Sequence, residues 1–201
     1  MRANFWGALH TILAALPGMR AQGGGRIVNV VSIGGKVGVP HLAPYTASKF
    51  ALGGLSEVLR AELALDDIVV TTVYPGLMRT GSPRHALFKG RHRAEFAWFS
   101  IADALPLLTI GVEPAARRIV RACERGESSV VLSLPAKLAA RVPALLPGTT
   151  AALLALVNRL LPRSDGAGRG PRRGRESESA WSPSPLTTLG ERAARAQNQR
   201  P

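Results

Sequence analysis

The first two thirds of the chain alternate between two kinds of segment. Short runs of apolar and β-branched residues, bounded by glycine or by charged residues, predict buried strands at residues 26–31, 68–74 and 129–132. The longer segments before and between them predict helices at residues 1–20, 44–64 and 114–125. Because strands that alternate with helices pair in parallel, the pattern predicts an α/β fold.

The pattern changes after residue 133. Residues 134–162 are rich in Ala, Leu and Val and predict an apolar helical extension, which three prolines interrupt: Pro135, Pro143 and Pro147. The longest apolar stretch, at residues 151–157, is far shorter than the ~20 residues that span a bilayer. Three arginines flank the apolar faces, two within the extension and one directly after it: Arg141, Arg159 and Arg163. This combination suits a helix that lies on an anionic membrane surface, and equally one that covers a substrate lid or a dimer partner.

Residues 163–201 form a basic tail. The chain has a formal net charge of +13 and a sequence pI near 11.5, and much of the concentrated charge lies at residues 169–175. This tract is poor in apolar residues, which predicts a disordered, solvated tail with at most a weak attraction to membranes. No aromatic residues are interleaved with the arginines to stack on bases, so no specific nucleic-acid binding is predicted.

The composition fits one globular core. The chain has 201 residues, of which 46% are hydrophobic and 19% charged, and this argues against a wholly disordered protein. Cys123 is the only cysteine, so an intramolecular disulfide is excluded and a cytoplasmic location is predicted. His85 and His92 are not accompanied by a cysteine or carboxylate cluster at metal-ligand spacing, so no metal site is predicted.

The most informative polar residues are Tyr45 and Lys49. They are four positions apart on a predicted helix, so the phenol and the ammonium share one face. A free phenol titrates near pH ~10, and an adjacent cation lowers this pKa toward neutrality. Ser32 follows the strand at residues 26–31, at the edge of a parallel sheet where ligands bind. The sequence therefore brings a hydroxyl, a phenol and an amine to one rim.

These residues resemble a known pattern. Ser32, followed thirteen positions later by Tyr45-x-x-x-Lys49, resembles the active site of the classical short-chain dehydrogenases/reductases. Asn4, in the sequence Asn-Phe-Trp-Gly, is similar in context to the asparagine that completes the tetrad of that family. The residues around and after this pattern resemble three successive blocks of the family, in the right order: residues 25–32, 44–51 and 74–80. The resemblance covers residues 1 to about 131.

The resemblance implies NAD(P)-dependent chemistry. Tyr45 would be the general acid in carbonyl reduction and the base in alcohol oxidation, and Ser32 would hold the substrate oxygen. Lys49 would lower the pKa of the tyrosine and bind the nicotinamide ribose, and Asn4 would support a water relay to Lys49. The implied cofactor-binding residues are Tyr45, Lys49, Pro75, Gly76, Met78 and Thr80.

One half of the family fold is not matched. The strand, glycine-rich turn and helix that hold the pyrophosphate have no counterpart, because no G-x-G-x-x-G sequence joins a strand to a helix here. We therefore expect the C-terminal half of a Rossmann-type doubly wound parallel sheet, truncated at its N-terminal side. The expected parts are residues 1–133 as a partial catalytic domain, 134–162 as the apolar extension and 163–201 as the tail. The choice between NAD and NADP stays open.

The variable segment at residues 80–111 would be the substrate lid of the family. Its apolar residues indicate either an apolar pocket wall or core beneath a loop: Phe88, Phe96, Trp98, Phe99 and Ile101. The expected substrate is a small apolar carbonyl compound or secondary alcohol, and the expected assembly is a homo-oligomer. The alternative function is a non-catalytic remnant that meets a membrane surface or a protein partner. A gene start inside a longer enzyme and a short inactive product both remain open.

Overall fold

The computed structural model describes residues 1–163 and 170–199. The chain divides into two compact units. The first unit comprises Met1–Gly76 and Ala115–Leu154, and the second comprises Leu77–Pro114 and Ala155–Pro201. Asn4, Ser32, Tyr45 and Lys49 all belong to the first unit.

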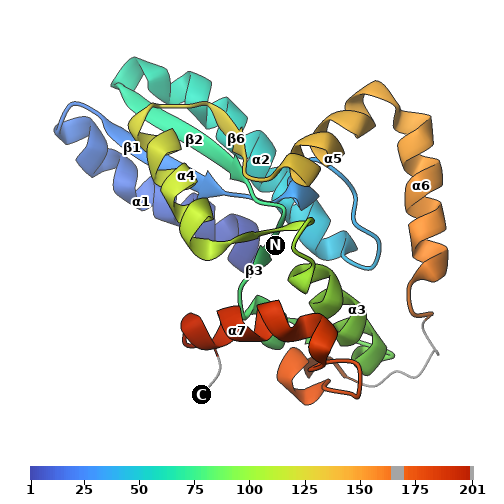
Figure 1. Ribbon diagram of the computed structural model, residues 1–201. Coiled ribbons are helices and arrows are strands. Elements are labelled where there is room, and N and C mark those ends of the chain that lie inside the picture. The colour runs from blue at the N-terminus through green and yellow to red at the C-terminus, as the bar shows by residue number, and fades with distance from the viewer. Residues whose placement is uncertain (164–169, 200–201) are drawn as a thin grey trace. The chain divides into compact units, whose positions relative to one another are not determined.

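The first unit contains a three-stranded parallel sheet with the order β1-β2-β6 (Figure 1). Its strands are β1 (Gly25–Val30), β2 (Ile68–Tyr74) and β6 (Ser129–Val131). The register pairs Gly25 with Ile68 and continues without a break to Val30 and Val73. The predicted strands and their parallel pairing are therefore confirmed, with the β-branched runs of the sequence forming the strands.

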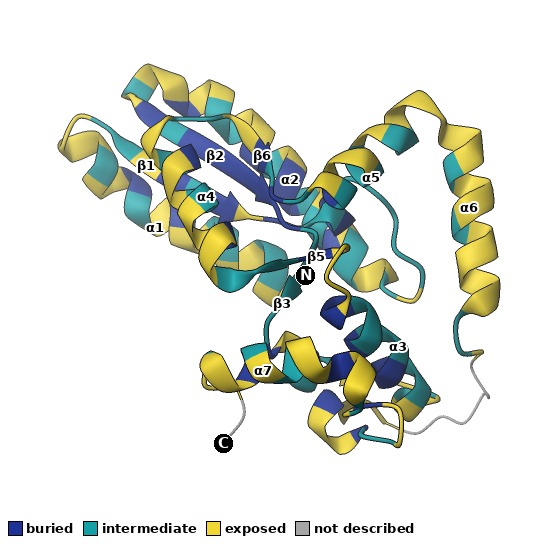
Figure 2. Cartoon of the chain, in the orientation of Figure 1, coloured by how far each residue is buried: buried dark blue, intermediate teal, exposed yellow. Residues whose placement is uncertain are grey.

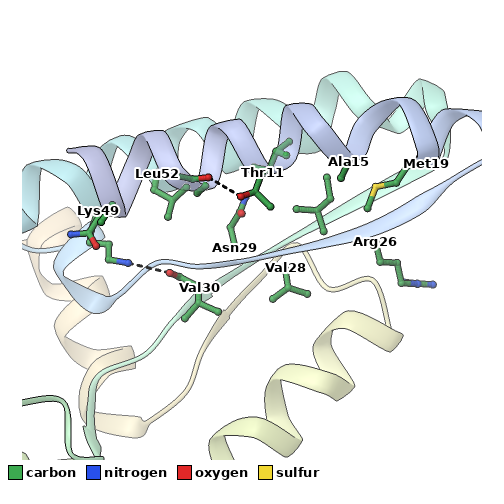
Figure 3. Close-up of a pocket in the computed structure, with 15 residues that line it drawn as sticks. Thr11, Ala15, Met19, Arg26, Val28, Asn29, Val30, Lys49 and Leu52 are labelled. Atoms are coloured by element: carbon green, nitrogen blue, oxygen red, sulfur yellow. Dashed lines mark hydrogen bonds between the residues drawn. The ribbon is translucent and has the colours of Figure 1, made fainter. Parts of the chain in front are cut away.

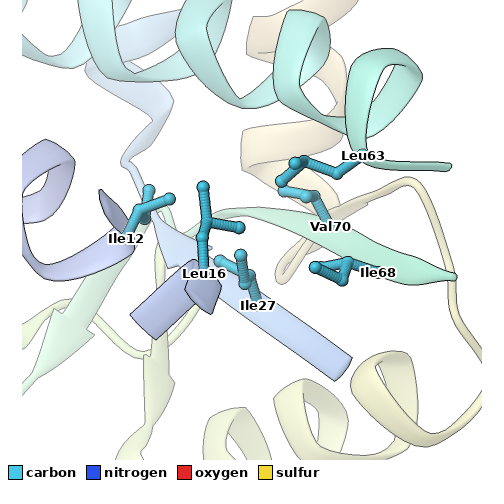
Figure 4. Close-up of a cluster of buried hydrophobic side chains, with 6 residues drawn as sticks. All are labelled: Ile12, Leu16, Ile27, Leu63, Ile68 and Val70. Carbon is cyan, nitrogen blue, oxygen red and sulfur yellow. The ribbon is translucent and has the colours of Figure 1, made fainter. Parts of the chain in front are cut away.

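Helices cover both faces of this sheet. A π-helical turn at Arg2–Trp6 leads into α1 (Gly7–Ala21); α2 (Ala43–Glu62) precedes β2, and α4 (Val112–Glu124) precedes β6. Helices α1 and α2 lie on one face and α4 on the other, as the close-ups show (Figures 3 and 4). The alternation of side chains along β1 agrees with this, since Asn29 donates to Ser56 Oγ of α2 at 2.8 Å. Arg26 lies on the opposite face of the sheet, and its Nη1 donates to the Cys123 carbonyl of α4 at 2.7 Å.

The core of the first unit lies between the sheet and α1. Figure 2 shows strand β2 as the most deeply buried element of the sheet. One apolar cluster joins α1, both long strands and the turn after α2 (Figure 4): Ile12, Leu16, Ile27, Leu63, Ile68 and Val70. Burying these side chains supplies the main driving force for docking the helix on the sheet.

Replacement of Ile68 by alanine is expected to destabilise the first unit by about 2–5 kcal/mol, because it leaves a cavity in a close-packed core. Ile68 is 1% exposed. The measurement is urea unfolding followed by circular dichroism. Leu65→Ala is the matched control, since Leu65 lies three residues away and is 93% exposed. Equal losses in the two variants would contradict the assigned core.

Strand β1 forms an edge of the sheet. Within residues 1–163 and 170–199 it pairs with β2 alone, so its second edge carries no strand. A hollow of about 510 Å³ follows this edge between α1 and β1, and its wall includes Thr11, Arg26 and Val28 (Figure 3). A bare edge at β1 agrees with the expected C-terminal half of a doubly wound sheet. We expect such an edge to favour aggregation.

The second unit is built around α3 (His92–Ala104). Strand β3 (Leu77–Arg79) pairs in parallel with β5 (Thr109–Gly111), and β4 (Leu87–Phe88) pairs antiparallel with β7 (Arg172–Arg173). Helix α7 (Thr188–Ala196) packs against α3 and β3. Phe96 of α3 is buried in this unit and meets Phe88 edge-on, with ring centres 5.7 Å apart.

The described part of the basic tail differs from the expected disorder. The Gly174 amide donates to the Ala86 carbonyl at 2.9 Å, and Arg84 Nη1 lies 2.8 Å from Glu178 Oε1. Its buried positions are small residues, which give no apolar run in the sequence: Gly174, Ser177, Ser182, Thr187 and Ala194. The rest of the disorder prediction, at residues 164–169 and 200–201, lies outside the described residues.

The extension at residues 134–162 is helical, as predicted. It forms α5 (Leu134–Leu145), capped by the Ser133 side chain, and α6 (Pro147–Leu160). Pro135 and Pro147 stand in the first turn of their helices, where a missing backbone N–H costs no hydrogen bond. Within the described residues, no helix combines the length and the apolarity that crossing a membrane requires.

Candidate active site

Tyr45 and Lys49 lie on the first two turns of α2. Pro44, in the first turn of this helix, has a fixed φ and lacks the N–H that a helix start would leave unpaired. The Lys49 Nζ atom lies 5.8 Å from the centre of the Tyr45 ring. The predicted shared face of the phenol and the ammonium is therefore present in the structure.

Ser32 is brought to the same place by the end of β1. The Val31 amide donates to the Val73 carbonyl at 2.8 Å, and the Ile33 amide donates to the Pro75 carbonyl at 2.7 Å. The pairing with the neighbouring chain segment thus continues on both sides of Ser32 and fixes its backbone. Its Oγ atom accepts a hydrogen bond from the Gly34 amide at 3.1 Å.

Gly34 lies beside both the serine and the tyrosine. A methyl group placed on Gly34 would lie 3.3 Å from Tyr45 Cε1 and 3.6 Å from Ser32 Oγ. The hydroxyl and the phenol ring therefore border the same glycine, and a larger side chain there would press on both groups. The predicted serine and tyrosine are brought together at the carboxyl end of the sheet.

Asn4 reaches this site through a residue that the sequence analysis missed. The Asn4 Nδ2 atom donates to Ser48 Oγ at 3.1 Å, and the Ser48 hydroxyl donates to the Tyr45 carbonyl at 2.6 Å. Ser48 is fully buried. This chain of bonds ties the turn at Arg2–Trp6 to the first turn of α2. The signal was available, because Ser48 lies inside the Tyr45 to Lys49 motif.

Lys49 has a hydrogen-bond partner within the first unit. Its Nζ atom donates to the Val30 carbonyl at 3.2 Å, at the end of β1. Burial lowers the pKa of the Lys49 ammonium, because desolvation disfavours its charged form. An ammonium has three donor hydrogens, so the bond to Val30 is compatible with a second bond to a ligand hydroxyl.

Asn4 and Lys49 also line the hollow beside β1 (Figure 3). The wall continues along α1 and β1 to Met19 and Arg26, while Ser32 and Tyr45 are not among the residues that form it. The hollow therefore follows the open edge of the sheet and reaches the candidate site at Asn4 and Lys49.

The predicted cofactor segment is divided between the two units. Pro75 and Gly76 follow β2 in the first unit, where a methyl group on Gly76 would lie 2.9 Å from the Ala136 side chain and 3.0 Å from Ser133 Oγ. Close packing against the start of α5 therefore explains this glycine. Met78 and Thr80 belong to the second unit, where the Thr80 hydroxyl donates to Ser82 Oγ at 2.9 Å. Their contact with a cofactor stays a prediction.

The aromatic residues of the predicted lid form a cluster. Phe99 lies between Phe88 and Trp98, with ring centres 6.1 and 5.6 Å away. Phe96 is core, so the interpretation as core beneath a loop holds for this residue. His92 Nδ1 lies 3.0 Å from Ser177 Oγ. Within the described ranges, no group of three or more His, Cys, Asp or Glu residues is placed to hold a metal ion.

Comparison with known proteins points to one family. Residues 1–87 match the family model described as short chain dehydrogenase. The chain is 37% identical over 137 residues to the putative oxidoreductase SadH of Mycobacterium tuberculosis, covering 67% of this chain and 49% of that protein. It is 35% identical over 133 residues to the dehydrogenase/reductase SDR family protein 7-like of Anopheles gambiae, covering 66% and 40%.

Solved structures give the same result for the fold. A short chain dehydrogenase from Burkholderia cenocepacia, in complex with NADP, superposes with a TM-score of 0.60 at 29% identity, over 75% of this chain and 55% of that one. Acetoin dehydrogenase from Enterobacter cloacae gives 0.51 at 27% identity, over 68% and 53%. These neighbours confirm the Rossmann-type α/β fold.

The chain spans about half the length of SadH and less of the Anopheles protein. The matched residues 1–87 nevertheless contain the whole Asn4, Ser32, Tyr45 and Lys49 pattern, and the parallel sheet places its serine and tyrosine beside one glycine. The resemblance seen in the sequence is therefore confirmed, and the chain belongs to the short-chain dehydrogenase family.

Proposed function

We propose that this protein acts as an NAD(P)-dependent oxidoreductase that interconverts a carbonyl group and a secondary alcohol. The observation that carries the proposal is that Ser32 Oγ and the Tyr45 ring both lie beside Gly34, with Lys49 one turn further along α2.

The residues have distinct tasks in this reaction. Tyr45 delivers the proton to the substrate oxygen during reduction, and the Ser32 hydroxyl donates a hydrogen bond that holds the same oxygen. The Lys49 ammonium, 5.8 Å from the centre of the Tyr45 ring, places a positive charge beside the acid and would bind the nicotinamide ribose. Asn4 acts through Ser48, whose bond to the Tyr45 carbonyl fixes the turn that carries the acid.

A nicotinamide cofactor, when bound, supplies or accepts the hydride. The residues present fit the nicotinamide end of such a cofactor, because the half-buried Lys49 ammonium has donors for ribose hydroxyls. They do not supply a glycine-rich turn for the pyrophosphate. NADP is the first cofactor to test, since the Burkholderia neighbour was solved in complex with it.

The wider assignments belong to the same proposal. The substrate is a small apolar carbonyl compound or alcohol, in keeping with the aromatic cluster of the second unit. The protein assembles as a homo-oligomer and works in the cytoplasm with a peripheral membrane contact. The apolar extension α5–α6 would make that contact.

Titration with NADPH and NADH, followed by nicotinamide fluorescence, tests the proposal. We expect binding in the millimolar range or tighter, and we expect Lys49→Met to weaken it by about 10-fold, the value of one hydrogen bond to a charged group. Lys36→Met is the matched control, because Lys36 pairs with Glu57 at 3.3 Å instead of facing Val30. Absence of binding at millimolar concentrations would show that this chain by itself is not an oxidoreductase.

A further inference from the structure

Helix α6 is apolar and yet contains no buried residue. Four of its apolar side chains lie on one stripe at the spacing i, i+3, i+4, i+7, and all four are exposed: Leu153, Leu156, Val157 and Leu160. Figure 2 shows the helix as almost entirely exposed. A helix of 14 residues is marginally stable in water unless it buries such a face. The stripe therefore calls for a partner outside the described chain.

Helix α5 continues the same kind of surface. Ala136 is buried, and its side chain borders Gly76, which anchors the start of α5 to the first unit. Leu134, Leu138 and Leu145, at i, i+4 and i+11, are each more than half exposed. One small face of α5 thus packs on the protein, while the larger leucines stay in solvent.

The charges on this segment all have one sign. No aspartate or glutamate occurs from residue 128 to residue 164. The segment instead carries four basic residues, and each of them is exposed: Lys137, Arg141, Arg159 and Arg163. The exposed surface of α5 and α6 is therefore both apolar and cationic.

An anionic lipid surface complements both properties. Its acyl region accepts the leucines, while its headgroups attract cations whose long side chains reach outward from an apolar face. A second copy of this chain complements them less well, because it would bring two sets of four cations together. We propose that residues 134–163 form a docking surface for an anionic lipid bilayer, on which α5 and α6 lie without crossing it. This inference rests on the peripheral contact proposed with the function and is independent of catalysis.

Co-sedimentation of the full chain with lipid vesicles tests the proposal. We expect binding to phosphatidylcholine vesicles that contain phosphatidylserine to be at least about 10-fold tighter than to pure phosphatidylcholine, and to weaken as salt rises. The variant Leu153→Gln/Leu156→Gln/Leu160→Gln should lose binding to both, and it should fold, since α6 buries none of its residues. Leu65→Gln/Leu107→Gln, which changes two exposed leucines elsewhere, should bind like the unchanged protein.

Charge variants show whether lipid binding depends on the cations of residues 134–163 or only on the net positive charge of the chain. Lys137→Gln/Arg141→Gln/Arg159→Gln should remove most of the preference for phosphatidylserine. Arg117→Gln/Arg121→Gln/Arg125→Gln removes the same number of charges at exposed positions on α4 and directly after it, outside residues 134–163. This variant should keep the preference. Equal losses in both variants would overturn the proposal.

Absence of vesicle binding by the unchanged protein would also overturn the proposal. If the unchanged protein is then a dimer and the leucine variant a monomer, as measured by analytical ultracentrifugation, the exposed face belongs to a second copy of the chain. Loss of NADPH binding with vesicle binding retained would count against the oxidoreductase function and leave the docking surface intact.

Discussion

Replacing Tyr45 with phenylalanine is expected to lower kcat/KM for the reduction of apolar ketones by about 10²–10⁴-fold, the usual contribution of a positioned general acid. The variant keeps the aromatic ring beside Gly34 and removes only the hydroxyl that donates the proton. Lys49 is unchanged, so cofactor affinity should stay within a few-fold of its original value. The measurement is NADPH oxidation at saturating cofactor, alongside the fluorescence titration.

Tyr74→Phe is the matched control, because the chain has two tyrosines. The Tyr74 hydroxyl lies 3.5 Å from Glu57 Oε1 and the Tyr74 ring packs beneath Lys36, so it takes part in a different cluster. Its removal should leave kcat/KM nearly unchanged. A similar loss in both variants, or retained activity in Tyr45→Phe, would show that Tyr45 is not the proton donor.

The strands of the first unit could be predicted because their residues carry the signal themselves. The run at residues 68–74 coincides with β2, and the run at residues 26–31 differs from β1 by one residue at each end. Both runs are rich in β-branched residues, and glycine or proline borders each of them on one side, so local propensity and tertiary burial agree. The closeness of Tyr45 and Lys49 could be predicted in the same local way, since one helical turn separates them.

The rest depends on contacts that no local pattern encodes. Ser177, Ser182 and Thr187 are buried in the second unit, although a segment rich in serine, proline and arginine is typical of disorder. The partner of Lys49 is likewise non-local, because the Val30 carbonyl accepts its bond across 19 positions of the sequence. The division of the chain into two units also joins residues 77–114 with residues after 154, which only the three-dimensional contacts reveal.

Asp103 is expected to make the stability of the protein depend on pH between about 4 and 7. It lies near the end of α3 and is 5% exposed, and its Oδ2 atom has no hydrogen-bond partner among residues 1–163 and 170–199. Burial raises the pKa of the Asp103 carboxyl from an ordinary 3.8 to about 7, against the opposing effects of the Met78 amide and the Arg79 charge. The folded protein therefore holds a proton that the unfolded chain releases above pH 4.

Because the folded state binds more protons in this range, the contribution of Asp103 to the free energy of unfolding is largest below pH 4. It falls by about 4 kcal/mol as the pH rises to 7 and then stays constant. Asp103→Asn cannot ionise, and its side-chain oxygen can still accept the Met78 amide, so the variant should lack this fall. Urea unfolding at pH 5 and pH 8 measures the difference, with Asp67→Asn, an exposed aspartate, as control. An unchanged pH dependence in Asp103→Asn would mean that the buried carboxyl is already ionised at pH 5.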